Sequence, residues 1–448
     1  MSQFASLDEA LEWLDSHIDH ESKVPSRRSI PTLDRMRELM QVLGDPERAY
    51  PSVHLTGTNG KGSTAALATA LLGAMGLGVG TYTSPNLSRV NERISRSGEP
   101  IDDESFTEVL GNLALVEPML TERPTRFELL TAAGLAWFAD VAVDAAVVEV
   151  GVGGTWDATN VVDGAVAVVT NISYDHTDIL GPTLEGIARD KAGIAKAGST
   201  VVVGETDPGL VAAIRSVADE AGAAQVWVRG EEFECTSNRM AVGGRLVTLR
   251  TPGAEYRDLL VPLHGAHQGT NAACALAAAE AFFGAPLPEE VVEGGLAAAR
   301  IAGRLEVVDR RPLCLVDGAH NVAGAQALAT ALGDFSVAGD KVGVVGMLSG
   351  RDPSAMLAPL LGAGVRTIVA CTPRSPRAQP AEVVAQAARS AGSGVEAVVA
   401  SSVADALSTA RAVAGEDGMV VVAGSLYLVT EARELLADPA ALPPPVGA

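Results

Sequence analysis

Short apolar segments that favour β-strands alternate with alanine-rich segments that favour helices along most of the chain. In the first part, strands are expected at residues 52–56, 77–82, 145–150, 165–170 and 200–203. Strands and helices that alternate in this way pack as a mostly parallel sheet covered by helices. The pattern therefore predicts an α/β protein.

The pattern changes twice further along the chain. Residues 225–263 favour short strands joined by turns, and residues 271–283 favour a helix. A second series of strands with helices between them is then expected at residues 305–308, 313–316, 341–345, 366–370, 395–399 and 419–423. Such a series makes a self-contained open sheet of the Rossmann type. We therefore expect two domains, residues 1–299 and a smaller one over residues 300–448.

Charge and hydropathy exclude several classes of protein. Lys and Arg total 33 against 55 Asp and Glu, which gives a formal net charge of −22. A chain this acidic lacks the basic surface that sequence-independent nucleic-acid binding requires. The longest uncharged segment, residues 62–88, is interrupted by Ser, Thr, Gly and Pro and is not expected to span a membrane.

The cysteines and the N-terminal segment indicate a cytoplasmic protein. The four cysteines lie far apart and form no CxxC pair, which argues against a disulfide framework or a zinc site. The first 21 residues are acidic and amphipathic, unlike a secretory signal peptide.

A glycine-rich segment, GTNGKGS at residues 57–63, follows the first expected strand and precedes a helix expected from Thr64. In this context glycines let backbone N–H groups approach phosphate oxygens, and Lys61 neutralises their charge. The strict GxxxxGK[ST] pattern is not met, because two residues separate Gly57 from Gly60 and Gly62 precedes Ser63. A plain glycine-rich turn is the alternative, and the lysine and flanking elements favour nucleotide binding.

Polar residues follow other expected strands. Glu149 ends the apolar run AAVVEV, where a carboxylate is costly unless it is paired or binds a cation such as Mg²⁺. His176 lies in the loop after the next strand, and Lys191 lies in an expected helix. Either side chain alone is better explained by an ordinary solvated or hydrogen-bonded role.

The glycine-rich segment begins a series of motifs that occur in the same order in the folylpolyglutamate synthase/dihydrofolate synthase branch of the Mur ligase superfamily. The series is GTNGKGS (57–63), YTSP (82–85), NERI (91–94), FELLT (127–131), EVGVGG (149–154), DATN (157–160), DHT (175–177), DKAGI (190–194), HQ (267–268), NA (271–272), GRLE (303–306), DGAHN (317–321) and GSLYL (424–428). Each motif alone is weak. Together they make the chain resemble this family over nearly its whole length.

The resemblance implies a Mur-ligase-like fold, with an N-terminal P-loop ATPase domain and a C-terminal Rossmann-like domain that binds glutamate. It also implies a ligase in which ATP phosphorylates a substrate carboxylate and the amino group of L-glutamate attacks the acyl phosphate. The expected acceptors are folates and dihydropteroate. ATP, Mg²⁺ at two sites and a monovalent cation are the expected cofactors, and the expected state is a monomer.

The resemblance also implies roles for individual residues. The expected ATP-binding residues are Thr58, Asn59, Gly60, Lys61, Gly62, Ser63, Asn271, Arg304 and Asp317, the last three acting across the domain interface. The expected metal ligands are Ser84, Glu149, His176 and Lys191, with Lys191 carboxylated by CO₂. The expected substrate residues are Thr125, Arg126, Trp156, Asp157, His320 and Ser425. The expected catalytic residues are Lys61, Lys191, His176 and His320.

The sequence departs from the family pattern mainly on the acceptor side. Asn86 replaces a usual His, Thr155–Trp156 a common Arg-Leu, and Val322 and Ala302 usual prolines, while residues 25–31 match no identified pterin-binding loop. One alternative is therefore a Mur-type ligase for another pterin, cofactor or cell-wall carboxylate. Another is a P-loop nucleotide-binding protein without ligase activity, which leaves Lys191, His320 and the second domain unexplained.

Overall fold

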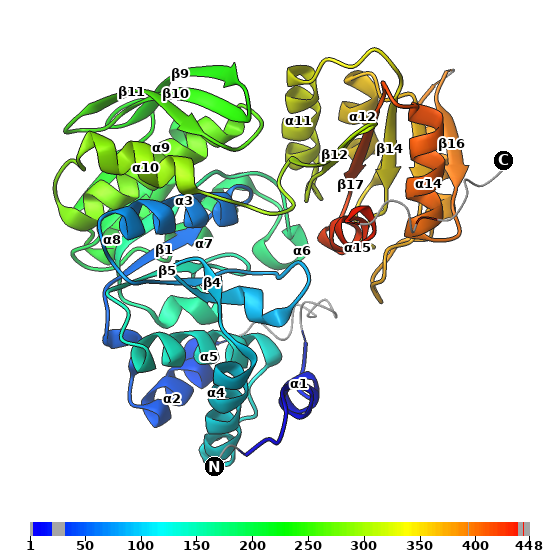
Figure 1. Cartoon of the computed structure of the whole chain (residues 1–448). Coiled ribbons are helices and arrows are strands. Elements are labelled where there is room, and N and C mark those ends of the chain that lie inside the picture. The colour runs from blue at the N-terminus through cyan, green and yellow to red at the C-terminus, as the bar shows by residue number, and fades with distance from the viewer. Residues whose placement is uncertain (1–2, 20–31, 393, 438–441, 443–448) are drawn as a thin grey trace. The chain divides into compact units, whose positions relative to one another are not determined.

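The computed structural model describes residues 3–19, 32–392, 394–437 and 442, and it divides into two compact units (Figure 1). Unit 1 comprises most of the chain up to Ala299. Unit 2 comprises the chain from Arg300 onward, together with the short segments Met240–Arg245 and Leu263–His267. The N-terminal residues 25–31, in which no pterin-binding loop was identified, lie outside the described residues.

An eight-stranded sheet with the order β4-β3-β2-β5-β1-β6-β7-β8 forms the centre of unit 1. Its strands are β1 (Ser52–Thr56), β2 (Val79–Tyr82), β3 (Ile94–Arg96), β4 (Glu99–Pro100), β5 (Ala145–Glu149), β6 (Gly164–Val169), β7 (Thr200–Val203) and β8 (Gln225–Val228). Only the pairs β2–β3 and β3–β4 are antiparallel within this sheet. The central strand β1 pairs in parallel with β5 and β6, so the loops that follow these three strands lie at one edge.

Helices cover both faces of this sheet, with α3 on one side of β1 and β5 and α5 on the other (Figure 1). The helices of unit 1 are α1 (Leu7–Asp15), α2 (Leu33–Leu43), α3 (Lys61–Ala74), α4 (Asp103–Val116), α5 (Arg126–Asp140), α6 (Thr177–Leu180), α7 (Leu184–Ala192), α8 (Pro208–Ala221), α9 (His267–Phe283) and α10 (Glu289–Ala298). Helices α1, α2, α4 and α5 share one apolar core with β2 and β5, and α7 and α8 share another with β6 and β7.

A separate three-stranded sheet follows β8 along the chain, with the order β11-β10-β9. Its strands are β9 (Glu234–Ala241), β10 (Gly244–Arg250) and β11 (Glu255–Val261). It packs on the alanine-rich helix α9 and on α10, where the Tyr256 hydroxyl donates to Glu280 Oε1 at 2.6 Å. These strands account for the short β segments expected over residues 225–263.

Unit 2 contains a six-stranded sheet with the order β12-β13-β17-β14-β15-β16. Its strands are β12 (Glu306–Arg310), β13 (Leu313–Val316), β14 (Lys341–Val345), β15 (Thr367–Ala370), β16 (Glu396–Val399) and β17 (Met419–Ala423). All neighbours are parallel except β12 and β13. The helices α11 (Val322–Ala331), α12 (Pro353–Gly362) and α13 (Ala381–Ser390) share a core with the sheet, and α14 (Val403–Ala414) packs with α15 (Leu426–Leu436).

The predicted α/β class and the two mostly parallel sheets are confirmed. The expected start of a helix at Thr64 is wrong, because α3 begins at Lys61. Gly60 precedes it with φ +83°, a left-handed conformation that glycine adopts without strain and that lets the helix begin directly after the loop.

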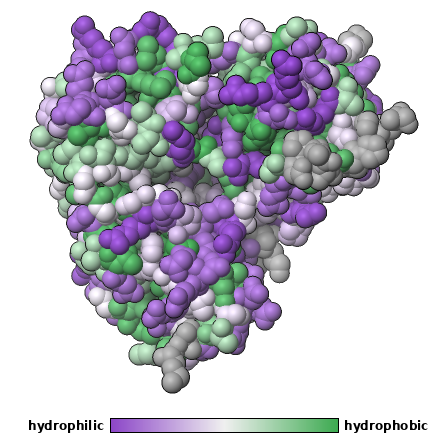
Figure 2. All heavy atoms as spheres, viewed as in Figure 1, coloured by the Kyte–Doolittle hydropathy of each residue, from purple (hydrophilic) through white to green (hydrophobic). Residues whose placement is uncertain are grey.

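Apolar side chains are buried mainly in these cores. The face of the molecule in Figure 2 is a mixture of hydrophilic residues and small hydrophobic patches. Among the described residues, every helix is too short or too polar to cross a membrane.

Candidate active site

The glycine-rich loop between β1 and α3 is closely packed against other parts of unit 1. A Cβ atom added to Gly57 would collide with the Thr170 hydroxyl, and one added to Gly60 would lie 2.5 Å from Asn271 Oδ1. Glycine is therefore required at both positions, and Asn271 lies directly beside the loop.

Residues that follow β6 fix the backbone of this loop. The Asn171 side chain accepts from Asn59 N at 3.0 Å and donates to Asn59 O at 2.8 Å. Thr170 Oγ1 also donates to Asn59 O, at 2.7 Å, and Thr58 Oγ1 donates to Ser173 O at 3.1 Å. Thr170 and Asn171 were not predicted from the sequence, although their place directly after an apolar strand was a usable signal.

Lys61 extends back over the loop from the first position of α3. Its Nζ donates to Gly57 O at 3.1 Å and to Thr58 O at 3.4 Å. A lysine at a helix N-terminus adds positive charge to the positive end of the helix dipole, which is unfavourable unless an anion binds there. The arrangement therefore suits the binding of phosphate groups.

Lys191 reaches the same loop from α7. Its side chain is buried, and its Nζ donates to Gly57 O at 2.9 Å. The pKa of Lys191 is lowered from 10.5 to about 7, mainly by burial and then by the charge of Lys61, whereas Asp190 and Asp175 oppose the shift. Near neutral pH a large share of this amine is therefore uncharged and nucleophilic.

Glu149 and Ser84 lie together beside the first turn of α3. The Ser84 backbone N donates to Glu149 Oε2 at 3.3 Å, and a Cβ at Gly62 would lie 3.5 Å from the same oxygen. The carboxylate and hydroxyl oxygens are of the kind that Mg²⁺ prefers. These two residues fit a magnesium ion next to the phosphate loop.

His176, another of the four expected metal ligands, follows β6. It adopts φ +49° just before α6, and its Nε2 lies 3.9 Å from Oδ1 of the buried Asp175. Asp175 in turn acts electrostatically on Lys191. In the described part of the chain, no cluster of three or more His, Cys, Asp or Glu could hold a metal. The proposed ligand set therefore depends on Ser84 and Lys191 as well as on Glu149 and His176.

The expected acceptor residues begin with Thr125 and Arg126 at the start of α5. Thr125 caps the helix, since its side chain accepts from Glu128 N at 3.2 Å while Glu128 Oε2 accepts from Thr125 N at 2.7 Å. Arg126 donates through Nε to Asp15 Oδ1 at 2.7 Å. Both residues are held by contacts within unit 1.

Asp157 and Trp156 follow the glycine-rich segment after β5. Asp157 is buried and accepts hydrogen bonds from Val152 N and Thr159 N, each at 3.0 Å. Burial raises the pKa of Asp157, and these hydrogen bonds oppose that rise. Asp157 therefore shapes the loop, whereas Trp156 is 52% exposed.

The expected residues of unit 2 follow β13 and β17, which are neighbouring strands. Asp317 accepts from Leu305 N at 2.7 Å and from Ala319 N at 2.8 Å. The Arg304 guanidinium packs against Gly318 so closely that a Cβ there would collide with it. Asp317 and Arg304 are thus brought together.

His320 and Ser425 lie on the same edge of this sheet. His320 Nδ1 lies 2.8 Å from Gly318 O, which makes Nδ1 the hydrogen-bearing nitrogen. Ser425 is buried and caps α15, where its hydroxyl accepts from Leu428 N at 3.2 Å. The Gly424 N–H donates to Ala319 O at 2.9 Å and joins the two loops.

Comparison with known families gives two matches. Residues 55–279 match the Mur ligase middle domain, and residues 303–426 match the Mur ligase glutamate ligase domain. Together they cover most of both units.

Individual proteins are similar over nearly their whole length. Dihydrofolate synthase/folylpolyglutamate synthase of Mycobacterium tuberculosis is 38% identical over 92% of this chain and 91% of that protein. Folylpolyglutamate synthase of Lacticaseibacillus casei is 34% identical, over 90% of this chain and 94% of that protein.

Solved structures agree with these matches. M. tuberculosis folylpolyglutamate synthase complexed with ADP has a TM-score of 0.88 and 37% identity, covering 96% of this chain and 98% of that one. E. coli FolC in complex with DHPP and ADP has a TM-score of 0.86 and 31% identity, covering 98% of this chain and 100% of that one. These relatives are ligases, so the alternative of a nucleotide-binding protein without ligase activity is wrong. The chain belongs to the folylpolyglutamate synthase/dihydrofolate synthase family of the Mur ligases and is an ATP-dependent carboxylate–amine ligase.

Proposed function

We propose that this enzyme adds L-glutamate to the carboxylate of folates and of dihydropteroate, and that the site built around Gly57 activates that carboxylate. The observation that carries the proposal is the convergence of Lys61 and Lys191 on one carbonyl oxygen of the glycine-rich loop, Gly57 O. Two lysines in a partly buried position call for an anionic ligand. The ADP complexes of the M. tuberculosis and E. coli relatives support ATP as that ligand.

The reaction has two steps. An oxygen of the acceptor carboxylate attacks the γ-phosphorus of ATP, the bond to the β-phosphate oxygen breaks, and ADP leaves. The amino group of L-glutamate then attacks the carbonyl carbon of the acyl phosphate, loses a proton and displaces inorganic phosphate. The protein contributes mainly by positioning the reactants and by stabilising the charge on the transferred phosphoryl group.

The phosphate loop holds the nucleotide in this scheme. The backbone N–H groups of Gly60 to Ser63, at the start of α3, face the phosphates, whereas those of Thr58 and Asn59 are bonded to Asn171. Lys61 moves from its carbonyl partners onto the phosphates. Asn271, beside Gly60, bounds the loop on one side. In unit 2 we assign Arg304 and Asp317 to the nucleotide, and His320 and Ser425 to ATP and the incoming glutamate, on the family resemblance.

We assign Mg²⁺ to Ser84, Glu149, His176 and Lys191. These residues would hold the ion beside the phosphate loop, where it would supply positive charge that stabilises the transferred phosphoryl group. Glu149 and Ser84 supply oxygen ligands beside the loop. Lys191 supplies one only after its amine has reacted with CO₂, and its lowered pKa makes that reaction feasible at neutral pH. We assign two magnesium sites and a further monovalent cation on the same resemblance.

We place the acceptor near Thr125, Arg126, Trp156 and Asp157. The departures from the family pattern at Asn86 and Thr155 are absorbed by contacts within the chain: Asn86 Oδ1 accepts from Arg93 Nε at 2.8 Å, and Thr155 Oγ1 donates to Asp190 O at 2.9 Å. Of these three positions, Trp156 is exposed to solvent, whereas Asn86 and Thr155 are partly buried. Substitutions of Trp156 are therefore the best test of whether this enzyme uses a different acceptor. We take the enzyme as a monomer.

The test is ADP release by the purified protein with Mg²⁺-ATP and L-glutamate, with dihydropteroate, tetrahydrofolate or no acceptor. The proposal expects release that requires both glutamate and an acceptor and that Lys61→Met abolishes. Turnover with tetrahydrofolate alone would restrict the activity to tail extension. If neither acceptor raises ADP release above background, the proposed substrates are wrong, and other carboxylates become the candidates.

A further inference from the structure

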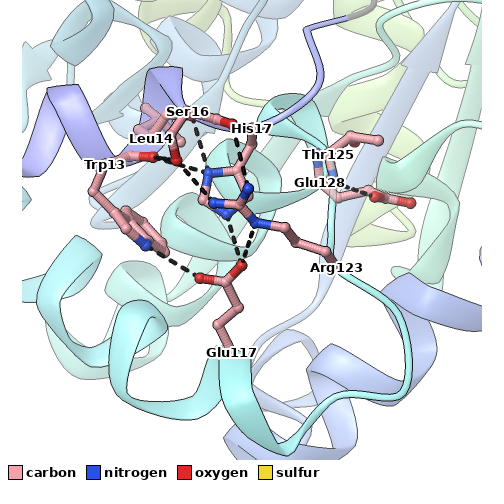
Figure 3. A network of polar contacts seen from close by, with 8 residues as sticks. All are labelled: Trp13, Leu14, Ser16, His17, Glu117, Arg123, Thr125 and Glu128. Atoms are coloured by element: carbon pink, nitrogen blue, oxygen red, sulfur yellow. Dashed lines mark hydrogen bonds and ion pairs between the residues drawn. The ribbon is translucent and has the colours of Figure 1, made fainter.

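A network of polar contacts outside the phosphate-loop site joins α1 to the segment that precedes α5 (Figure 3). At its centre, the Glu117 carboxylate accepts hydrogen bonds from Trp13 Nε1 at 3.1 Å, His17 Nε2 at 2.9 Å and Arg123 Nε at 2.8 Å. Partial burial raises the pKa of Glu117, but the hydrogen bonds from Arg123 and His17 outweigh this and lower it overall. Glu117 is therefore ionised and holds three donors at neutral pH.

His17 ties this carboxylate to the end of α1. The ring is buried and packs edge-on against Trp13, with the ring centroids 4.9 Å apart. Its Nδ1 lies 2.9 Å from Trp13 O and 3.2 Å from Leu14 O, the carbonyls at the C-terminal end of the helix. These carbonyls also accept from Ser16 N and His17 N, so the ring is packed against a helix end that is already capped by backbone bonds.

Further contacts run from the end of α1 to the beginning of α5. Arg123 Nη2 donates to Ser16 Oγ at 2.8 Å, and Arg126 Nε donates to Asp15 Oδ1 at 2.7 Å. The Arg126 backbone N donates to Ile18 O at 3.0 Å. The first N–H groups of a helix also lack intrahelical partners, so this bond fixes where α5 begins.

Helix α2 holds the same start of α5 from another direction. Arg35 donates to Glu128 Oε1 at 3.3 Å through Nε and at 3.1 Å through Nη2, and Glu128 completes the cap with Thr125. Arg35 also reaches Glu122 Oε2 at 3.3 Å. Thr125 and Arg126 are thus held in place through contacts with the first two helices of the chain.

We propose that the network of Trp13, Asp15, Ser16, His17, Glu117 and Arg123, here called the α1 latch, positions the start of α5 for binding the acceptor substrate. Arg123 and Asp15 are its positioning residues, acting through the Thr125–Arg126 backbone and side chains. The inference rests on the proposed function, which places the acceptor at these two residues. The phosphate loop is held by residues that follow β6 and makes none of the contacts of the α1 latch. We therefore expect changes in the α1 latch to affect acceptor binding and to leave ATP binding unchanged.

The test uses residues that can change without disturbing the core. The side chains of Arg123 and Asp15 are 56% and 61% exposed, and Arg37, also 61% exposed and paired with Asp34 on α2, gives a matched control. Kinetics of ADP release are measured for wild type, Arg123→Ala, Arg123→Lys, Asp15→Asn and Arg37→Ala, together with the Tm of each.

Arg123→Ala and Asp15→Asn are expected to raise KM for the acceptor about two- to fivefold, the range of an exposed ion pair. The values of kcat, KM for ATP and Tm stay close to those of Arg37→Ala. Arg123→Lys is expected to raise KM for the acceptor less than Arg123→Ala does, because the lysine amine can still bind Glu117 but has no second nitrogen for Ser16.

Three results would overturn the inference. An unchanged acceptor KM in an active enzyme contradicts it and leaves the proposed function standing. If kcat, every KM and Tm change together, the α1 latch contributes only to the general stability of the protein. Absence of acceptor-dependent ADP release in the wild type contradicts the proposed function first, and the inference falls with it.

Discussion

Lys191 Nζ donates a 2.9 Å hydrogen bond to the carbonyl oxygen of Gly57, the residue that opens the phosphate loop. Helix α7 is thereby fastened to the end of β1. Lys61 donates to the same oxygen. When both side chains are protonated to ammonium groups, they repel each other. This explains why burial and a second positive charge act in the same direction on the pKa of Lys191.

The pH dependence of stability follows from Lys191. The unfolded chain keeps this proton up to about pH 10.5 and the folded chain only below about pH 7. Between these values the unfolded state binds more protons, so the free energy of unfolding rises with pH, by at most about 1.4 kcal/mol per unit. Urea unfolding at pH 7, 8 and 9 in CO₂-free buffer should show this rise in the wild type relative to Lys191→Met. A constant difference between the two proteins would contradict the lowered pKa.

Carboxylation of Lys191 gives a second prediction. ADP release should fall by about tenfold or more in CO₂-depleted buffer and return when bicarbonate is added, because one metal ligand is then lost and restored. Lys191→Arg, which keeps the charge but cannot carry the modification, should be inactive under both conditions. If the wild-type rate of ADP release does not depend on bicarbonate, and the intact protein shows no added mass of CO₂, Lys191 is not carboxylated and the prediction is wrong.

Gly60 provides a test of the loop packing. Gly60→Ala places a side chain at φ +83° and 2.5 Å from Asn271 Oδ1, whereas Gly44→Ala meets a similar φ of +86° in open space. Both variants should lose about 1–2 kcal/mol of stability from the backbone conformation. Gly60→Ala alone should raise KM for ATP. Equal ATP kinetics in the two variants would mean that the contact with Asn271 does not matter for the nucleotide.

Two helix caps in unit 2 form a matched pair. Ser425 caps α15 and Ser402 caps α14, with hydrogen bonds of 3.2 and 3.1 Å. Replacing either by Ala should lower stability by about 1 kcal/mol. The proposed role of Ser425 requires that Ser425→Ala also raises KM for glutamate or ATP, measured by ADP release. If both variants behave alike, Ser425 has only its capping role.

Much of the fold was predictable because the strands are apolar runs with clear ends. The strands β1, β7, β13, β14 and β17 have the expected bounds. The predicted start of α3 at Thr64 was wrong. The conformation of Gly60 decides where this helix begins, and sequence periodicity does not report a backbone angle.

The motifs of the candidate site could be recognised in the sequence, but the contacts among its residues could not. Thr125 and Glu128 form a capping box whose TRFE signature was present in the sequence at residues 125–128. The α1 latch gave no comparable signal, because His17 and Glu117 are 100 residues apart and only the packing of α1 on α4 brings them together. Contacts of this kind depend on tertiary structure rather than on local pattern.

The strand order of unit 1 has a consequence for how such enzymes diverge. The loops after β1 and β6 are interlocked by the bonds of Thr170 and Asn171 to Asn59, so a substitution in one constrains the other. Trp156 and the start of α5 make none of these bonds. With the acceptor placed near Trp156 as proposed above, substitutions at this exposed position can change acceptor preference while the interlocked loops are inherited unchanged.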